Sequence, residues 1–96
     1  MDIVFEVIDK TGRKIRLTRK QFKHIICHKG MENEIDKIKS ALINPLKIIP
    51  HEEGELYDYY KYYKERKNKS KFPQVVVRYL NGKGFVVTSY FVRKII

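Results

Sequence analysis

The sequence has no tryptophan and only one cysteine, Cys27, in 96 residues. A single cysteine cannot form a disulfide within the chain, which fits a reducing compartment. No apolar run is long enough to cross a bilayer, and the first residues lack the basic start and apolar stretch of a secretion signal. We therefore expect a cytoplasmic protein that does not associate with membranes.

Acidic residues are also scarce. The chain carries 11 Asp and Glu against 21 Lys and Arg, a formal net charge of +10. Such a field attracts polyanions, so nucleic acid is the first expected partner, before an acidic protein. Hydrophobic residues make up 43% of the chain, which excludes a disordered protein. The length predicts a single domain, residues 1–96, with one modest core.

The first half of the sequence predicts a hairpin and two helices. Residues 3–8 and 13–17 read as strands joined by the turn 9–12. Thr18 is typical of a helix N-cap, Gln21 completes a capping box, and Gly30 marks the far end. The first helix should therefore run from Arg19 to Lys29, with a second helix from about Met31 to the Asn44-Pro45 pair.

Two histidines lie on one ridge of the first predicted helix. At 100° per residue, Phe22, Ile25 and Ile26 form the core side, whereas His24 and His28 stack away from it. Lys20 and Gln21 flank the same ridge. This pattern indicates acid–base chemistry on an anionic substrate or half of a metal site, although a solvated surface pair has the same spacing.

The second half predicts strands. Residues 46–49 read as an edge strand closed by Pro50, and residues 56–63 as a tyrosine-rich strand. A basic connector, residues 64–71, is typical of a mobile loop that can contact a phosphate backbone. Residues 74–80 and 85–93 form the clearest hairpin, around the turn 81–84. An odd-with-odd register would pack Phe85 and Val87 against the helices.

On the opposite face of this hairpin we expect Arg78, Thr88 and Tyr90 to project together. The whole pattern predicts an α+β domain: an N-terminal β-hairpin, two α-helices, then an antiparallel β-sheet with the helices packed on one face.

The order of these motifs resembles the phage-associated nucleases of the barnase/EndoU/colicin/RelE-like (BECR) fold. The resemblance covers most of the chain, and its motifs are short, so it depends on their succession. They are Arg16-Leu17-Thr18, Phe22, His24-Ile25 and His28, the helix end Leu42 to Pro45, the tyrosine-bearing strand, and a final hairpin with Val75-Val76-Val77-Arg78 and Gly84 to Phe91. The chain has Lys29-Gly30 where the family often has Pro-Glu.

The resemblance implies a metal-independent endoribonuclease that needs no cofactor. RNA carries its own nucleophile, the 2′-OH, so the protein must move two protons and stabilise the phosphorane, leaving a 2′,3′-cyclic phosphate and a 5′-OH. The expected catalytic residues are His24, His28, Arg78, Thr88 and Tyr90. The expected RNA-binding residues are Arg16, Lys20, Lys64, Arg66, Lys67, Lys69, Lys71, Tyr60 and Tyr62.

Other interpretations stay open from the sequence. The basic surface and the tyrosines also suit a non-catalytic RNA-binding domain. His51 could join His24 and His28 in a metal site, a weaker hypothesis, and Cys27 as a nucleophile is weaker still. Family analogy extends the nuclease to a toxin held by an acidic antitoxin, as a monomer or a dimer.

Overall fold

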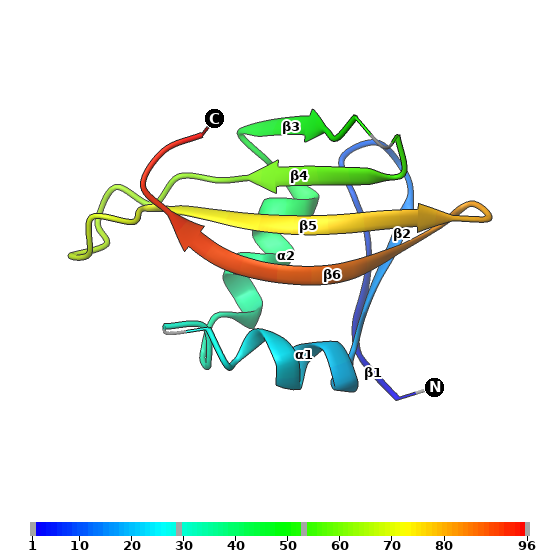
Figure 1. Cartoon of the computed structure of the whole chain (residues 1–96), viewed down its shortest axis with the longest axis horizontal. Helices are drawn as coiled ribbons and strands as arrows, with labels where there is room; N and C mark the ends of the chain where they lie inside the picture. The colour runs from blue at the N-terminus through cyan, green and yellow to red at the C-terminus, as the bar shows by residue number, and fades with distance from the viewer. Residues whose placement is uncertain (1, 29, 53, 96) are drawn as a thin grey trace.

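The computed structural model describes residues 2–28, 30–52 and 54–95. It is an α+β fold in which two helices accompany a six-stranded mixed sheet (Figure 1). The elements in chain order are β1 (Ile3–Ile8), β2 (Lys14–Thr18), α1 (Arg19–Ile25), α2 (Ile35–Ile43), β3 (Lys47–Pro50), β4 (Leu56–Tyr60), β5 (Phe72–Leu80) and β6 (Lys83–Val92). No helix in the described ranges is long and apolar enough to cross a membrane.

The prediction of a purely antiparallel sheet is wrong. The sheet has the order β1-β2-β6-β5-β4-β3, and β2 pairs with β6 in parallel through Ile15↔Gly84 and Arg16↔Phe85. The N-terminal hairpin therefore extends the same sheet. Gly84 lies at this junction because a Cβ there would come within 2.9 Å of side-chain atoms of Ile15 and Tyr79. The predicted edge position of β3 is confirmed.

The final hairpin forms as predicted at its turn but not along its whole length. Asn81 and Gly82 both have positive φ, as a two-residue hairpin turn requires. The register then shifts: Val76 pairs with Thr88, but Val77 pairs with Val86. Val87 is the extra residue of this bulge. In consequence Val86 is 1% exposed in the core, and the predicted core side of Phe85 and Val87 is wrong.

The first helix begins as predicted and ends early. The backbone N–H of Gln21 donates to Thr18 Oγ1 at 3.2 Å, which confirms the N-cap. The helix ends at Ile25, and turns follow. The predicted end at Lys29 lies outside the described residues. The expected core position of Ile26 is wrong, because its side chain is 38% exposed.

The second helix covers one face of the sheet. It begins at Ile35, later than predicted, and its end before Pro45 is confirmed. Met31 is fully buried but belongs to the preceding loop. In Figure 1, α2 crosses behind the sheet, while α1 lies along β6. The core between the helices and the sheet contains Phe5, Ile15, Leu17, Ile25, Met31, Ile38, Ala41, Leu42, Tyr59, Val75, Val77 and Val86.

Candidate functional site

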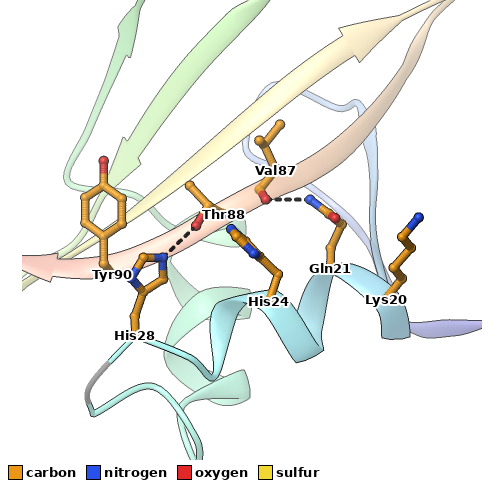
Figure 2. Close-up of a pocket in the computed structure, with 7 residues that line it drawn as sticks. All are labelled: Lys20, Gln21, His24, His28, Val87, Thr88 and Tyr90. Atoms are coloured by element: carbon orange, nitrogen blue, oxygen red, sulfur yellow. Dashed lines mark hydrogen bonds between the residues drawn. The ribbon is translucent and has the colours of Figure 1, made fainter.

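A hollow of about 470 Å³ lies between α1 and the second half of β6. We call it the histidine pocket. Its lining consists of Lys20, Gln21, His24, His28, Val87, Thr88 and Tyr90. Both imidazoles point from the α1 side toward β6 (Figure 2). Two predicted catalytic residues of the first helix thus meet two of the last strand.

Contacts in the histidine pocket centre on His28. Its Nε2 lies 3.2 Å from Thr88 Oγ1, within hydrogen-bond distance. The His28 ring stands edge-on to Tyr90, with centroids 5.5 Å apart, and to His24, with centroids 5.9 Å apart. Figure 2 shows His24, His28 and Thr88 turned toward one another, whereas the Tyr90 hydroxyl points away from the histidines. An anionic group entering the histidine pocket could contact both imidazoles.

The bulge in β6 holds α1 in place. β2 pairs with only the start of β6, and beyond that point α1 lies beside the strand. The Gln21 side chain donates from Nε2 to the Val87 carbonyl oxygen at 2.6 Å (Figure 2). Gln21, His24 and His28 follow one another at spacings of three and four residues. Anchoring Gln21 directs His24, one turn further along α1, toward β6, and the turn after Ile25 brings His28 beside Thr88.

Arg66 approaches the same site from the long loop before β5. It shares a second hollow with His28 and Tyr90, together with Gly30, Asn68, Ser70 and Phe91. The guanidinium stacks on the Phe91 ring, 3.5 Å from its centroid, and Nε donates to the Ser70 carbonyl oxygen at 3.0 Å. Both contacts leave the terminal amino groups of Arg66 available to a phosphate.

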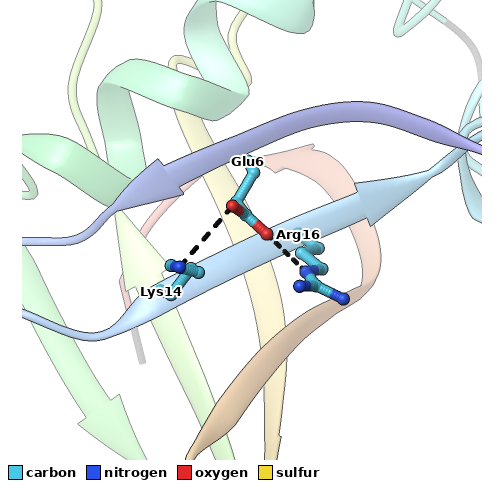
Figure 3. Close-up of polar contacts among 3 residues, drawn as sticks. All are labelled: Glu6, Lys14 and Arg16. Carbon is cyan, nitrogen blue, oxygen red and sulfur yellow. Dashed lines mark hydrogen bonds and ion pairs between the residues drawn. The ribbon is translucent and has the colours of Figure 1, made fainter.

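Two other predicted cations are paired elsewhere. Arg78 lies 3.5 Å from Glu55 and does not line the histidine pocket. Arg16 forms a close ion pair with Glu6, whose other oxygen lies 3.9 Å from Lys14 Nζ (Figure 3). Arg78 does share the sheet face of Thr88 and Tyr90, as predicted, but it does not join them in the histidine pocket. Lys20, which is exposed, remains beside the histidines.

The remaining predicted RNA-binding residues are dispersed. Lys64, Lys67 and Lys69 are exposed on the loop, and the Lys71 ammonium donates to the Arg66 carbonyl oxygen. Tyr62 is 46% exposed and packs on Phe72, with ring centroids 4.9 Å apart. Together with Lys69 and Lys71 it lines a separate hollow.

The tyrosine strand ends earlier than predicted, at Tyr60. Tyr60 is only 3% exposed, so its ring has no open face for base stacking. Burial, then the neighbouring Asp58 and Tyr90, raise the pKa of the Tyr60 phenol to about 12. Burial and Asp58 also raise the pKa of Tyr90. Both phenols stay protonated at neutral pH and can donate hydrogen bonds.

A cluster that the sequence analysis missed lies beside Tyr90. A hollow of about 570 Å³ is lined by Ile49, Pro50, His51, Glu52, Asp58, Tyr60, Gln74, Tyr90 and Val92, and we call it the carboxylate hollow. His51 Nε2 lies 2.8 Å from Asp58 Oδ1. The sequence does contain one indication of this hollow. Asp58 is an acidic residue inside an aromatic strand, a position where Asp is disfavoured unless it has a role.

The arrangement supports neither a metal site that includes His51 nor Cys27 as a nucleophile. Among residues 2–28, 30–52 and 54–95, no three His, Cys, Asp or Glu side chains gather as metal ligands. His51 lines the carboxylate hollow and not the histidine pocket. Cys27 is exposed, and its thiol donates to the Lys23 carbonyl oxygen at 3.4 Å. Neither residue lines the histidine pocket.

Comparison with protein-family models, with curated proteins and with solved structures finds no match to this chain.

Proposed function

We propose that the protein is a small, metal-independent endoribonuclease of the BECR type. The observation that carries the proposal is the histidine pocket, where His24 and His28 face one opening beside Thr88 and Tyr90. Imidazole titrates near neutral pH, so two of them can serve as acid and base in one reaction. The net charge of +10 supports a polyanionic substrate.

The chemistry needs one neutral and one protonated imidazole. The neutral ring accepts the proton of the RNA 2′-OH as its oxygen attacks phosphorus. The protonated ring gives its proton to the departing 5′ oxygen, so the bond to that oxygen breaks as the new one forms. The products are a 2′,3′-cyclic phosphate and a 5′-OH. Thr88 supplies a hydroxyl for the imidazole or for a phosphate oxygen, and the Tyr90 ring borders His28.

Arg66, which shares the adjoining hollow with His28 and Tyr90, is the cation that we assign to the phosphorane. Its stacking on Phe91 and its bond to Ser70 fix the guanidinium before substrate arrives, so less side-chain entropy is lost on binding. Lys20 flanks the opening from the other side. The pairing of Arg78 with Glu55 favours Arg66 over Arg78 for this role.

The test is incubation of purified protein with a mixed RNA pool in EDTA, followed by end-group analysis. The parent should produce cyclic phosphates, and the double variant His24→Ala, His28→Ala should produce none while keeping its circular dichroism spectrum. Lys23→Ala is the matched control, because Lys23 is exposed on α1 and outside the histidine pocket.

Three results would count against the proposal. Equal cleavage by parent and double variant would show a contaminating nuclease. Unfolding of the double variant would show that the histidines are structural. RNA that is retained but never cut by the parent would favour the alternative, a non-catalytic RNA-binding domain. A toxin role with an acidic antitoxin becomes testable only after cleavage is observed.

A further inference from the structure

The hollow around Tyr62 lies at the end of the sheet where β5 begins and β6 ends, the end that carries the basic loop in Figure 1. Phe72 pairs with Val92 there. The pair Gln74 and Tyr90 is two residues further along both strands, roughly 7 Å away. Within the described ranges, this hollow shares no lining residue with the histidine pocket. We call it the Tyr62 hollow; its volume is about 400 Å³, and its lining consists of Leu46, Tyr62, Lys69, Lys71, Phe72 and Arg93.

One side of the Tyr62 hollow is aromatic and open to solvent. The rings of Tyr62 and Phe72 are tilted by 36°, with centroids 4.9 Å apart. Tyr62 is 46% exposed and Leu46 is 63% exposed, so apolar surface beside the ring pair is uncovered. Exposed apolar surface of this kind often marks a binding site. A flat ring can stack there, because the contact with Phe72 already holds the Tyr62 ring in place.

The other side of the Tyr62 hollow is cationic. Lys69 and Lys71 come from the basic loop, and Arg93 follows β6. The described lining contains no acidic residue. In contrast to Arg16 and Arg78, none of these three cations forms an ion pair with another described residue. Their charge therefore attracts an anion into the hollow.

Lys71 is held in position before any ligand binds. Its ammonium donates to the Arg66 carbonyl oxygen, and its own carbonyl oxygen accepts from the backbone N–H of Tyr63 at 2.9 Å. An ammonium has three N–H donors, so two remain for phosphate oxygens. Part of the side-chain entropy that a mobile lysine loses on binding is thus lost already on folding.

We propose that the Tyr62 hollow is a nucleotide site separate from the histidine pocket, in which the base stacks on Tyr62 and the phosphate binds the three cations. A mononucleotide unites a flat ring and a dianion in one ligand, and the hollow has the volume of a small-molecule site. A free nucleotide and one nucleotide of an RNA strand offer the same chemistry. The inference needs no cleavage and goes beyond the proposed ribonuclease.

The test is titration of adenosine 5′-monophosphate (AMP) into the full chain, followed by amide NMR shifts. Ribose 5-phosphate, which lacks the base, and adenosine, which lacks the phosphate, are titrated in parallel. The parent should bind AMP about tenfold more tightly than either fragment, with shifts at the residues of the Tyr62 hollow. Tyr62→Leu keeps an apolar side chain and removes the ring, so it should lower the affinity for AMP about tenfold.

A pair of double variants tests the cations. Lys69→Gln with Arg93→Gln should lower the affinity for AMP about tenfold. The matched control is Lys67→Gln with Lys94→Gln, which removes the same charge from neighbouring exposed positions outside the hollow and should change the affinity less than about twofold. Equal losses in the two double variants would overturn the inference, as would AMP shifts confined to the histidine pocket or ribose 5-phosphate bound as tightly as AMP. If Tyr62→Leu does not fold, the fragments and the double variants still decide.

A DNA-substituted strand that cannot be cleaved identifies the source of the nucleotide. If the hollow takes part of a strand, the strand should displace AMP and should itself bind more weakly to Tyr62→Leu. If the hollow takes a free nucleotide, the AMP shifts should persist after the strand has bound. RNA cleavage by a protein that binds no AMP in the hollow would remove this site and keep the enzyme. AMP bound in the hollow of a protein that cuts no RNA would keep the site and remove the enzyme.

Discussion

At the scale of single residues, the contact between Thr88 and His28 is the most informative one. A hydrogen bond of this kind contributes about 1 kcal/mol, so Thr88→Val should lower kcat about fivefold with little change in KM. The measurement is steady-state cleavage of a short RNA across pH, because loss of the hydroxyl should also move the pH profile. Thr88→Ser keeps the oxygen and should recover most of the activity; equal impairment of both variants would indicate a packing role.

Arg66 gives a second prediction at this scale. A charge-assisted bond to the phosphorane is worth about 2 kcal/mol, so Arg66→Ala should lower kcat/KM about thirtyfold. Arg66→Lys should stay impaired, because an ammonium cannot stack on Phe91 as a guanidinium does. Arg78→Ala is the comparison. A larger loss in Arg78→Ala than in Arg66→Ala would restore the role that the sequence suggested for Arg78.

Sequence patterns located part of the site at this scale and missed the rest for a physical reason. Helical spacing predicts that His24 and His28 share one ridge; α1 ends at Ile25, but the turn that follows still brings His28 beside His24, Thr88 and Tyr90. The partner of each cation could not be predicted in this way. Arg78 on β5 meets Glu55, which directly precedes the neighbouring strand β4, so the contact depends on a pairing remote in sequence.

At the scale of elements, the turn between β1 and β2 is fixed by a buried carboxylate. Asp9 is 4% exposed and accepts hydrogen bonds from the backbone N–H groups of Thr11 and Arg13, at 3.0 and 2.8 Å. It also accepts from the hydroxyls of Tyr59 and Tyr79. The first hairpin is thereby attached to β4 and β5, on which the carboxylate hollow is built.

The Asp9 network predicts a pH dependence of stability. Burial opposes ionisation of Asp9, but its hydrogen bonds from Tyr59, Arg13 and Thr11 outweigh burial and hold the pKa below the ordinary 3.8. A lowered pKa in the folded state contributes stability that is complete above about pH 4 and is lost as the pH falls through the folded value. Urea unfolding at pH 7 and pH 3 should show this loss in the parent and a smaller one in Asp9→Asn.

Asp9→Asn should also cost about 3 kcal/mol at pH 7, because several bonds to a charged acceptor are weakened together. Tyr79→Phe, which removes one of the donors, should cost less. An Asp9→Asn variant as stable as the parent at pH 7 would show that the hydrogen bonds to Asp9 only offset the free-energy cost of burying its charge.

The attachment of α1 to the bulge gives another element-scale prediction. Gln21→Leu loses the bond to the Val87 carbonyl oxygen and leaves that acceptor unpaired, so unfolding should become easier by about 1–3 kcal/mol. Thermal unfolding checks this value. Thr18→Ala, which removes only the N-cap, should cost about 1 kcal/mol. If Gln21→Leu also reduces cleavage more than Thr18→Ala does, the anchor positions the histidines.

The bulge shows why the element boundaries were only partly predictable. Local chemistry specified the Thr18 cap and the Asn81-Gly82 turn, because each depends on a few adjacent residues. The shift at Val87 has no such signal in the sequence. It depends on β5, β6 and α1 packing together, as does the parallel pairing of β2 with β6, so neither was expected.

At the scale of the whole molecule, the net charge of +10 should govern RNA affinity. Binding of a single strand releases counterions, and log K falls with log salt by about 0.7 for each phosphate contacted. The basic loop, at the opposite end of the sheet from the turn between β5 and β6 in Figure 1, carries Lys64, Lys67 and Lys69 next to Arg66. Replacing these three lysines with Gln should flatten the slope by about 2.

A control variant replaces Lys10, Lys39 and Lys83, which lie on the first hairpin, on α2 and at the turn between β5 and β6. It carries the same net charge as the loop variant. If bound RNA lies along the histidine pocket and the loop, only the loop variant should flatten the salt slope. The slope is measured by fluorescence anisotropy with a DNA-substituted strand that cannot be cleaved. Equal slopes in the two variants would mean that the overall field attracts RNA and that the loop makes no phosphate contacts of its own.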